Sequence, residues 1–474
     1  MAWFGQEIFR VKEFKRSCAD YFAHRGNGKR VKTGKEGKKM LNNRKRKENP
    51  YLQGNYAPVT EQIDETNLEV IGQIPQDLSG LFVRNGPNPM NNPKPAKHHW
   101  FSGQGMLHGV RLDSGNALWY RNRSVSANGN SPNTHVISHA GKVYAIVEGG
   151  GAPVEIDAEL GSLGDAPFQG TLKRGFTAHA KLDAASGELH GICYDFARGY
   201  QLQHIVVGKD DRVRQTQVID LPSRPMVHDC AITENYVLVF DLSITFNWVR
   251  LVRGYLPMAW NDKHQARIGL VNRHTGSADI AWFDIDPCYI FHPVNAFEDS
   301  AGNVVLDAMR YQRLFDKDWN GPFTESPPLL TRWQLDKESG TARQEQLDDK
   351  PAEFPRIHPG LEGKQHRFGY ALGLGASVLK PDFDSIIKYD FADVTSERHE
   401  FSAGRMGAEP VFVPAENAES EGHGYLLSYV FDRSSDKSSL VVFNAQDLCT
   451  GPVAEIRLPQ RIPFGFHGNW VPAE

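Results

Sequence analysis

Along most of the chain, hydrophobic residues occur in short runs of Val, Ile, Leu, Tyr and Phe, separated by clusters of Gly, Asn, Asp, Ser and Pro. This pattern begins near Asn49 and continues to the C-terminus. The chain contains 44 Gly and 28 Pro, and the three-to-four-residue hydrophobic period of a helix is scarce there. Many short strands divided by turn residues are typical of an all-β sandwich, barrel or propeller. We therefore expect a single all-β domain over residues 49–474.

The strand-like runs repeat in units that each open on a polar residue. The predicted openings are Thr134, His179, His228, His292, His366, Glu409 and His467. The steps between the first four are 45, 49 and 64 residues, a spacing that suits the several strands of a propeller blade. Seven openings predict a seven-bladed β-propeller.

The last predicted unit opens at His467, which leaves too few residues for a whole blade. Strands expected at 81–84 and within 106–119 can complete it, so that both ends of the chain close the ring. Closure in this way removes the exposed sheet edge that an open ring would leave.

The first 48 residues differ from the rest and predict a basic N-terminal arm. A helical stripe, spaced by three and four residues, consists of Phe4, Ile8, Val11, Phe14, Cys18 and Tyr21. A polybasic linker follows, and residues 1–47 carry 15 Lys and Arg against four acidic residues. The arm could lie on an anionic membrane surface. The alternatives are a helix packed on the body with a solvated linker, or a nuclear-import or nucleic-acid signal.

Composition narrows the class of protein. The 474-residue chain has no apolar run near the roughly 18 residues of a membrane span, and no signal-peptide core follows Met1. Its five cysteines are scattered without a CxxC pair, which favours reduced thiols in the cytoplasm. Residues 48–474 are acidic overall and would repel phosphates, so we expect no nucleic-acid partner.

Candidate metal ligands are the histidines that open four of the predicted inner strands. Equivalent positions of different blades converge on the axis of a propeller, so His179, His228, His292 and His467 are expected to meet at one point. Convergent imidazoles suit Fe, Cu, Zn or Ni, and their spacing does not choose among these metals. Any one of them alone would more simply be a structural histidine.

Metal-bound imidazoles need a partner on the other ring nitrogen, usually a carboxylate. Glu148, Glu353 and Glu409 are the candidates, because each lies in apolar, Gly- and Pro-rich surroundings where an unpaired carboxylate is costly. The alternative for each is a surface carboxylate at a strand end. Asp229 is left out, because adjacent strand residues face opposite sides, and Glu298 because it adjoins a turn.

Several segments, in order, resemble the carotenoid cleavage oxygenase family. They are FVRNGPNP (82–89), WFSGQGMLHG (100–109), TAHAK (177–181), VHD (227–229), FHPVNAFE (291–298), EFPRI (353–357), EPVFVP (409–414) and FHGNW (466–470). The resemblance extends from about Asn49 to the C-terminus and excludes only the basic arm.

The resemblance implies a seven-bladed propeller with a helical or loop cap over the metal-bearing face. It implies Fe(II) bound by the four histidines at 179, 228, 292 and 467. The glutamates at 148, 353 and 409 would then be bonded to three of these histidines. The family's iron-adjacent threonine corresponds to Thr134, whose methyl group would crowd one open coordination position.

The implied activity is a dioxygenase that uses O2 to split a double bond of a polyene into two carbonyl fragments, without an electron-donating cosubstrate. Such substrates are long and apolar, so we expect a nonpolar tunnel and a peripheral membrane-docking patch. Relatives that cleave phenolic stilbenes carry Lys immediately before the first glutamate, whereas this chain has Val147. An apolar residue there favours carotenoids or apocarotenoids.

Three other functions remain open at this point. The chain could cleave stilbenes, act as an isomerohydrolase on retinyl esters without consuming O2, or be a non-catalytic propeller scaffold. The intact set of four histidines and three glutamates argues against the scaffold. The double bond cut, the symmetry of cleavage, the preferred isomer and the oligomeric state are not encoded in a recognisable motif.

Overall fold

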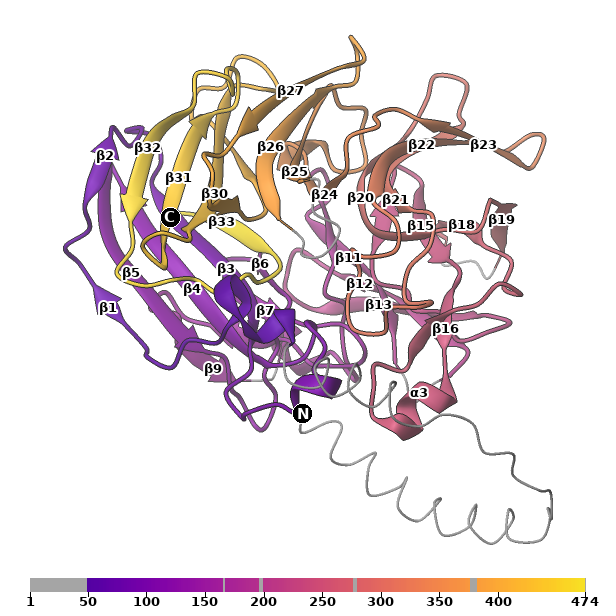
Figure 1. Cartoon of the computed structure of the whole chain (residues 1–474). Coiled ribbons are helices and arrows are strands. Elements are labelled where there is room, and N and C mark those ends of the chain that lie inside the picture. Colours follow the sequence, from indigo (N-terminus) through magenta and orange to yellow (C-terminus); the bar gives the residue numbers. More distant parts are fainter. Residues whose placement is uncertain (1–48, 165–166, 196–198, 276–278, 376–381, 474) are drawn as a thin grey trace, which may run out of the picture.

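The computed structural model describes residues 49–164, 167–195, 199–275, 279–375 and 382–473. The predicted basic arm lies outside these ranges and remains a prediction. Within the described residues, 33 strands form seven antiparallel sheets of four to six strands and one two-stranded sheet. The seven sheets surround a common centre as propeller blades (Figure 1), which confirms the predicted fold class.

Five blades are four-stranded sheets whose strands follow one another outward from the axis. Blade 2 contains β6 (His135–His139), β7 (Lys142–Ile146), β8 (Val154–Ile156) and β9 (Ser162–Gly164). Blade 3 contains β10 (Lys181–Asp183), β11 (Glu188–Tyr194), β12 (Gln201–Val207) and β13 (Val213–Asp220). Blade 4 contains β14 (Cys230–Ile232), β15 (Tyr236–Asp241), β18 (Arg267–Asn272) and β19 (Ile280–Asp284). Blade 5 contains β20 (Tyr289–Glu298), β21 (Val304–Tyr311), β22 (Pro328–Asp336) and β23 (Thr341–Gln346). Blade 6 contains β24 (Ala352–Arg356), β25 (Phe368–Leu374), β26 (Phe383–Asp390) and β27 (Thr395–Glu400).

The two remaining blades combine strands from both ends of the chain. Blade 7 contains β28 (Arg405–Gly407), β29 (Val411–Pro414), β30 (Gly424–Asp432), β31 (Lys437–Asn444), β32 (Pro452–Arg457) and β2 (Val70–Gly72). Blade 1 contains β33 (Gly468–Pro472), β3 (Gly80–Asn88), β4 (Gln104–Asp113), β5 (Asn116–Ser124) and β1 (Asp64–Glu65). The N-terminal β2 pairs with β32, and the C-terminal β33 pairs with β3. The ring is therefore closed twice, and the predicted completion of the last blade is confirmed.

Burial changes from the inner to the outer strands of a blade. All residues of β20 are buried except the last, whereas β13 alternates between half-buried and exposed residues over most of its length. An inner strand is covered on both faces by neighbouring blades and reads as a continuous apolar run. An outer strand keeps one face toward solvent, so its apolar positions alternate. Aromatic side chains join the blades, as where the rings of Phe82 and Tyr429 approach to 4.9 Å between their centroids.

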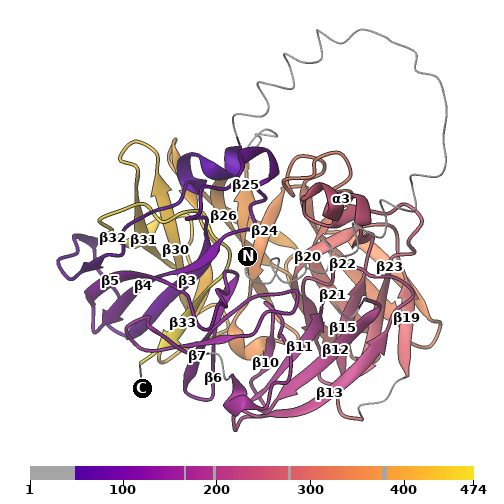
Figure 2. The ribbon, with the colours of Figure 1, turned by 90° about the horizontal axis from the view of Figure 1, so that it is seen from below.

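A cap lies over one end of the ring. It includes the small sheet of β16 (Ile244–Phe246) and β17 (Met258–Trp260), with α3 (Trp248–Arg253) between them. Figures 1 and 2 place α3 on the same side of the sheets as η1 (Pro50–Leu52) and η2 (Gly54–Tyr56). The other short helices are η3 (Pro95–Lys97), η4 (Phe168–Gly170) and η5 (Pro359–Leu361). No helix in the described ranges is long and apolar enough to cross a membrane.

One predicted opening is wrong. The inner strand of blade 6 is β24, which begins at Ala352, and His366 only precedes the second strand, β25. The strand is hard to see in the sequence because Pro355 interrupts it and Phe354 has a positive φ of 55° at a register shift. His366 instead contacts Asn295, with 3.2 Å between Nδ1 and Nδ2.

The pairing of β3 with β33, which closes the ring, leaves no room for a side chain at Gly80, which pairs with Pro472. A Cβ at Gly80 would lie 2.5 Å from the ring of Trp470 and 2.5 Å from the backbone oxygen of Val471. We expect Gly80→Ala to lower the free energy of unfolding by about 1–3 kcal/mol, the usual cost of overpacking. Urea denaturation of the whole protein measures it. Gly164→Ala is the matched control, because nothing lies within 4 Å of a Cβ there. Equal midpoints for the two variants would contradict the role of this contact.

Candidate metal centre

The four predicted histidines lie together at the centre of the propeller. His179, His228 and His467 come just before the inner strands β10, β14 and β33, and His292 lies within β20. All four are buried, and one potential ligand atom from each lies within 4.8 Å of the others. The Nε2 atoms of His228 and His292 are 3.3 Å apart. The fold therefore brings together side chains that are up to 288 residues apart in the sequence.

Three of these imidazoles each contact one of the predicted glutamates. Nδ1 of His228 is 2.8 Å from Oε2 of Glu148. Nδ1 of His292 and Oε2 of Glu353 are 2.5 Å apart, and Nδ1 of His467 and Oε1 of Glu409 are 2.8 Å apart. A carboxylate partner makes Nδ1 the protonated donor, so the Nε2 lone pair remains available on the inner side.

The electrostatics of the cluster favour the neutral form of two of these imidazoles, whereas at His228 burial is outweighed by the attraction of Glu148, which raises the pKa. Burial, reinforced by the neighbouring histidines, holds the pKa of His179 well below its usual value. Burial has the same effect on the pKa of His467, where it outweighs the attraction of Glu409. Neutral imidazole is the form that binds metal ions, so these two side chains are available as ligands at neutral pH.

The donor set fits a metal ion. Nε2 of His179 is buried and has no hydrogen-bond partner in the described structure, and an orphaned buried nitrogen is costly unless something binds it. Four imidazole nitrogens are suitable ligands for Fe, Cu, Zn or Ni. The residues present therefore fit the iron that the sequence resemblance implies, and their geometry does not identify the metal.

An arginine that the sequence reasoning did not assign supports this centre. Arg356 donates from Nε to Oε1 of Glu409 at 2.9 Å and from Nη2 to Oε2 at 3.1 Å. Nη2 also donates to the carbonyl oxygen of Gly468 at 2.6 Å. Although burial opposes it, pairing with Arg356 and His467 keeps the pKa of Glu409 well below its usual value. The signal was present in the segment EFPRI, which places this arginine three residues after Glu353.

Asp229 lies closer to the histidine cluster than we expected from its position directly after His228. Its Oδ2 is 3.6 Å from Nδ1 of His179 on the adjacent blade. That separation is too long for a direct hydrogen bond. The carboxylate is instead paired with Nζ of Lys181 at 3.0 Å. The contact between blades could not be foreseen from alternation along a single strand.

A cavity opens on the histidine cluster. Thr134, Val147 and Glu148 line it together with His228, His292 and His467. The hydroxyl of Thr134 donates to Oδ1 of Asn133 at 3.1 Å. The rest of the lining is largely apolar and includes Phe101, Met226, Leu256, Phe291, Phe323 and Phe354. The cavity therefore suits a hydrophobic molecule with one segment beside the imidazoles.

Comparisons with known proteins identify the family of this chain. The sequence model of the family described as retinal pigment epithelial membrane protein matches residues 56–472. A protein from Mycobacterium tuberculosis named carotenoid cleavage oxygenase is 38% identical, over 90% of this chain and 98% of its own length. Among solved structures, lignostilbene dioxygenase from Pseudomonas brassicacearum has a TM-score of 0.82 at 26% identity, over 90% of this chain and 98% of that one.

An apocarotenoid oxygenase from Synechocystis has a TM-score of 0.80 at 23% identity, over the same shares of the two chains, which supports the fold. The family model covers nearly the whole described region, and the Mycobacterium tuberculosis protein is similar over almost its full length. The chain belongs to the carotenoid cleavage oxygenase family.

Proposed function

We propose that this protein is an Fe(II)-dependent dioxygenase that cleaves a carbon–carbon double bond of a carotenoid or apocarotenoid into carbonyl products. The observation that carries the proposal is the buried four-histidine cluster opening on an apolar cavity. Family membership supports oxygenase chemistry, because the similar proteins are named oxygenases and dioxygenases.

His179, His228, His292 and His467 would hold the iron. When bound there, the ion supplies O2 activation at a centre whose ligands are all neutral, without a carboxylate ligand. Glu148, Glu353 and Glu409 fix the orientation of three imidazoles through Nδ1. Thr134 lines the cavity beside these ligands, and its methyl group would restrict the space next to the bound ion. The apolar walls orient the polyene and exclude water from the reacting bond.

Val147 favours a polyene over a phenol as substrate. It lines the cavity immediately before Glu148 and offers no hydrogen bond to a phenolic hydroxyl. The similarity to a lignostilbene dioxygenase keeps stilbene cleavage as the second candidate. Comparing the turnover rates of apocarotenals and hydroxystilbenes distinguishes these two candidates. Measuring O2 consumption distinguishes both of them from an isomerohydrolase, which consumes no O2.

We also propose that α3 docks on a membrane surface from which such a substrate is drawn. Trp248, Val249 and Val252 on this helix are 58%, 55% and 60% exposed. Leu256, which lines the cavity, follows the helix closely in the chain. Exposed Trp and aliphatic residues on a short helix are suited to the interfacial layer of a bilayer. The basic arm would add attraction to anionic lipid.

Product analysis tests the proposed reaction. With O2 present, mass spectrometry of wild-type reactions over a panel of carotenoids and apocarotenoids should detect paired aldehyde or ketone fragments. His292→Ala should lose bound iron, measured by elemental analysis, together with activity, because it removes one of the four ligands. Stoichiometric iron in this variant would remove His292 from the ligand set, and iron-free protein that still cleaves polyenes would refute the proposed function.

Glu353→Gln should lower turnover about 10–100-fold, as is typical when the partner of a metal-bound imidazole is lost. The fold should be retained, because the amide is nearly the same size. Steady-state kinetics and circular dichroism measure the two effects. Glu400→Gln on the exposed end of β27 is the control and should match wild type. Unchanged turnover in Glu353→Gln would make this glutamate a bystander.

Val252→Glu should weaken liposome binding and leave turnover of detergent-solubilised substrate unchanged, because it places a charge on the proposed docking helix. Sedimentation with vesicles containing anionic lipid gives the bound fraction. Leu163→Glu changes a residue of similar exposure, 61%, on the outer strand β9 and serves as the control. If both variants bind vesicles as wild type does, α3 is not the docking element.

A further inference from the structure

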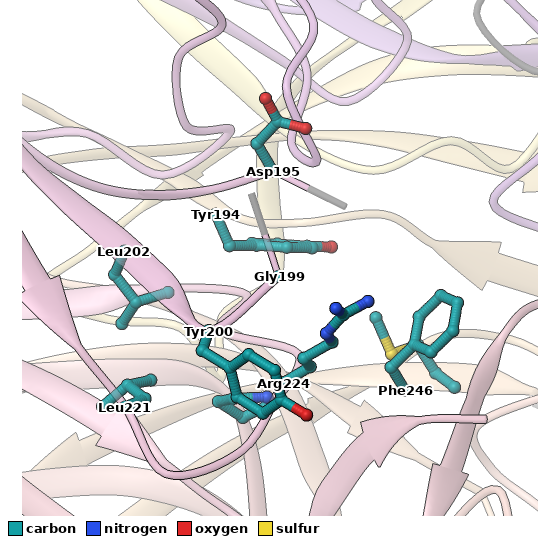
Figure 3. Close-up of a pocket in the computed structure, with 10 residues that line it drawn as sticks. Tyr194, Asp195, Gly199, Tyr200, Leu202, Leu221, Arg224 and Phe246 are labelled. Carbon is teal, nitrogen blue, oxygen red and sulfur yellow. The ribbon is translucent and has the colours of Figure 1, made fainter. Parts of the chain in front are cut away.

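A second, smaller cavity adjoins the one that opens on the histidines. Tyr194 and Met258 line both cavities. On its other side the second cavity is lined by Tyr200, Arg224 and Phe246. Figure 3 shows the guanidinium of Arg224 between the rings of Tyr200 and Phe246, directed toward Tyr194. The two cavities therefore share a wall made of two side chains.

Aromatic rings surround the positive charge of Arg224. Its guanidinium carbon lies 4.9 Å from the ring centroid of Tyr200 and 5.9 Å from those of Phe246 and Trp248. Asp195 also lines the cavity, but its carboxylate points away from Arg224 beyond Tyr194 (Figure 3). Within the described ranges, no acidic side chain lies within 4 Å of this guanidinium. The guanidinium groups of Arg332 and Arg356, in contrast, are each paired with a carboxylate.

One buried hydrogen-bond donor of Arg224, its Nε, is also without a partner among the described residues. Guanidinium groups carry five N–H donors and bind carboxylates in a planar, two-pronged geometry. A buried donor without a partner is costly. A ligand that brings an anionic acceptor would relieve this cost.

The chain itself connects Arg224 to the histidine cluster. Arg224 and Pro225 line the small cavity, while Met226 and His228 line the large one. His228 is the fourth residue after Arg224, so their Cα atoms are at most about 14 Å apart. One elongated molecule can therefore reach from the cluster to Arg224.

The size of the small cavity limits what can enter it. Its free volume is about 10 Å³, which corresponds to roughly one water molecule. A narrow linear end group would need smaller side-chain shifts to enter this space than a cyclic end group would. The charge and the size together select a small acidic terminus.

We propose that Arg224 binds the carboxylate end of an acyclic-ended apocarotenoid while its polyene passes Tyr194 and Met258 to the histidine cluster. This inference rests on the proposed function for the identity of the polyene. Arg224 would thereby set which substrates are preferred and which double bond lies beside the imidazoles.

The test compares two ligands that differ only at the linear end, all-trans-retinoic acid and all-trans-retinol. Tryptophan fluorescence quenching under nitrogen measures their binding to the full-length, iron-loaded protein without turnover. Wild type should bind the acid about 10–100-fold more tightly than the alcohol, the range expected for a charge-assisted hydrogen bond. Arg224→Gln should lose this preference and still bind the alcohol as wild type does.

Two further variants sharpen the result. Arg224→Lys should keep part of the preference, because it retains the charge but not the planar fork. Arg433→Gln, which removes the same charge from a half-exposed pair with Asp382, should behave as wild type. The proposal is overturned if wild type shows no preference for the acid, or if the preference survives in Arg224→Gln. A third outcome separates the two proposals: Arg224→Gln loses the preference for the acid, but the wild-type protein cleaves no polyene. This outcome would refute the proposed function and would support the Arg224 site.

Discussion

Four imidazoles can occupy one buried volume only if they are neutral and each is held in orientation. Burial and mutual repulsion disfavour the charged forms of His179 and His467. Carboxylates at Nδ1 of His228, His292 and His467 then fix which nitrogen faces inward. The propeller brings these groups together, because its inner strands deliver one side chain from each of several blades to the axis.

The strand pairing that closes the ring also positions part of the histidine site. His467 immediately precedes β33, the C-terminal strand that pairs with β3. Arg356 on β24 joins Glu409 to the carbonyl oxygen of Gly468 and so links blade 6, blade 7 and the closing strand. The backbone N–H of Gly468 also donates to Glu409, at 2.7 Å. Stability of the terminal strand and geometry of the fourth imidazole are therefore coupled.

With increasing distance from the histidines, the lining of the cavities changes from apolar side chains to a positively charged one. The cluster opens on apolar walls, and the boundary at Tyr194 and Met258 leads to Arg224, which has no ion-pair partner among the described residues. Trp248 connects this region to the cap, because it lies on α3 and its ring faces Arg224 at 5.9 Å. A long molecule with one acidic end and an apolar body matches this order. If α3 docks on a membrane as proposed, that end would lie near the surface of the bilayer.

The sequence by itself determined the all-β class, the seven units, the closure by both chain ends, and the positions of four histidines and three glutamates. These features are visible because turn residues, apolar runs and polar strand openings are local properties of the chain. Only the tertiary structure decided that blade 6 opens at Ala352, that Arg356 clamps Glu409, that Asp229 lies beside His179 of another blade, and that Arg224 has no carboxylate partner among the described residues. Each of these depends on contacts between blades, and neither spacing nor alternation within one strand specifies which side chains of two different blades will meet.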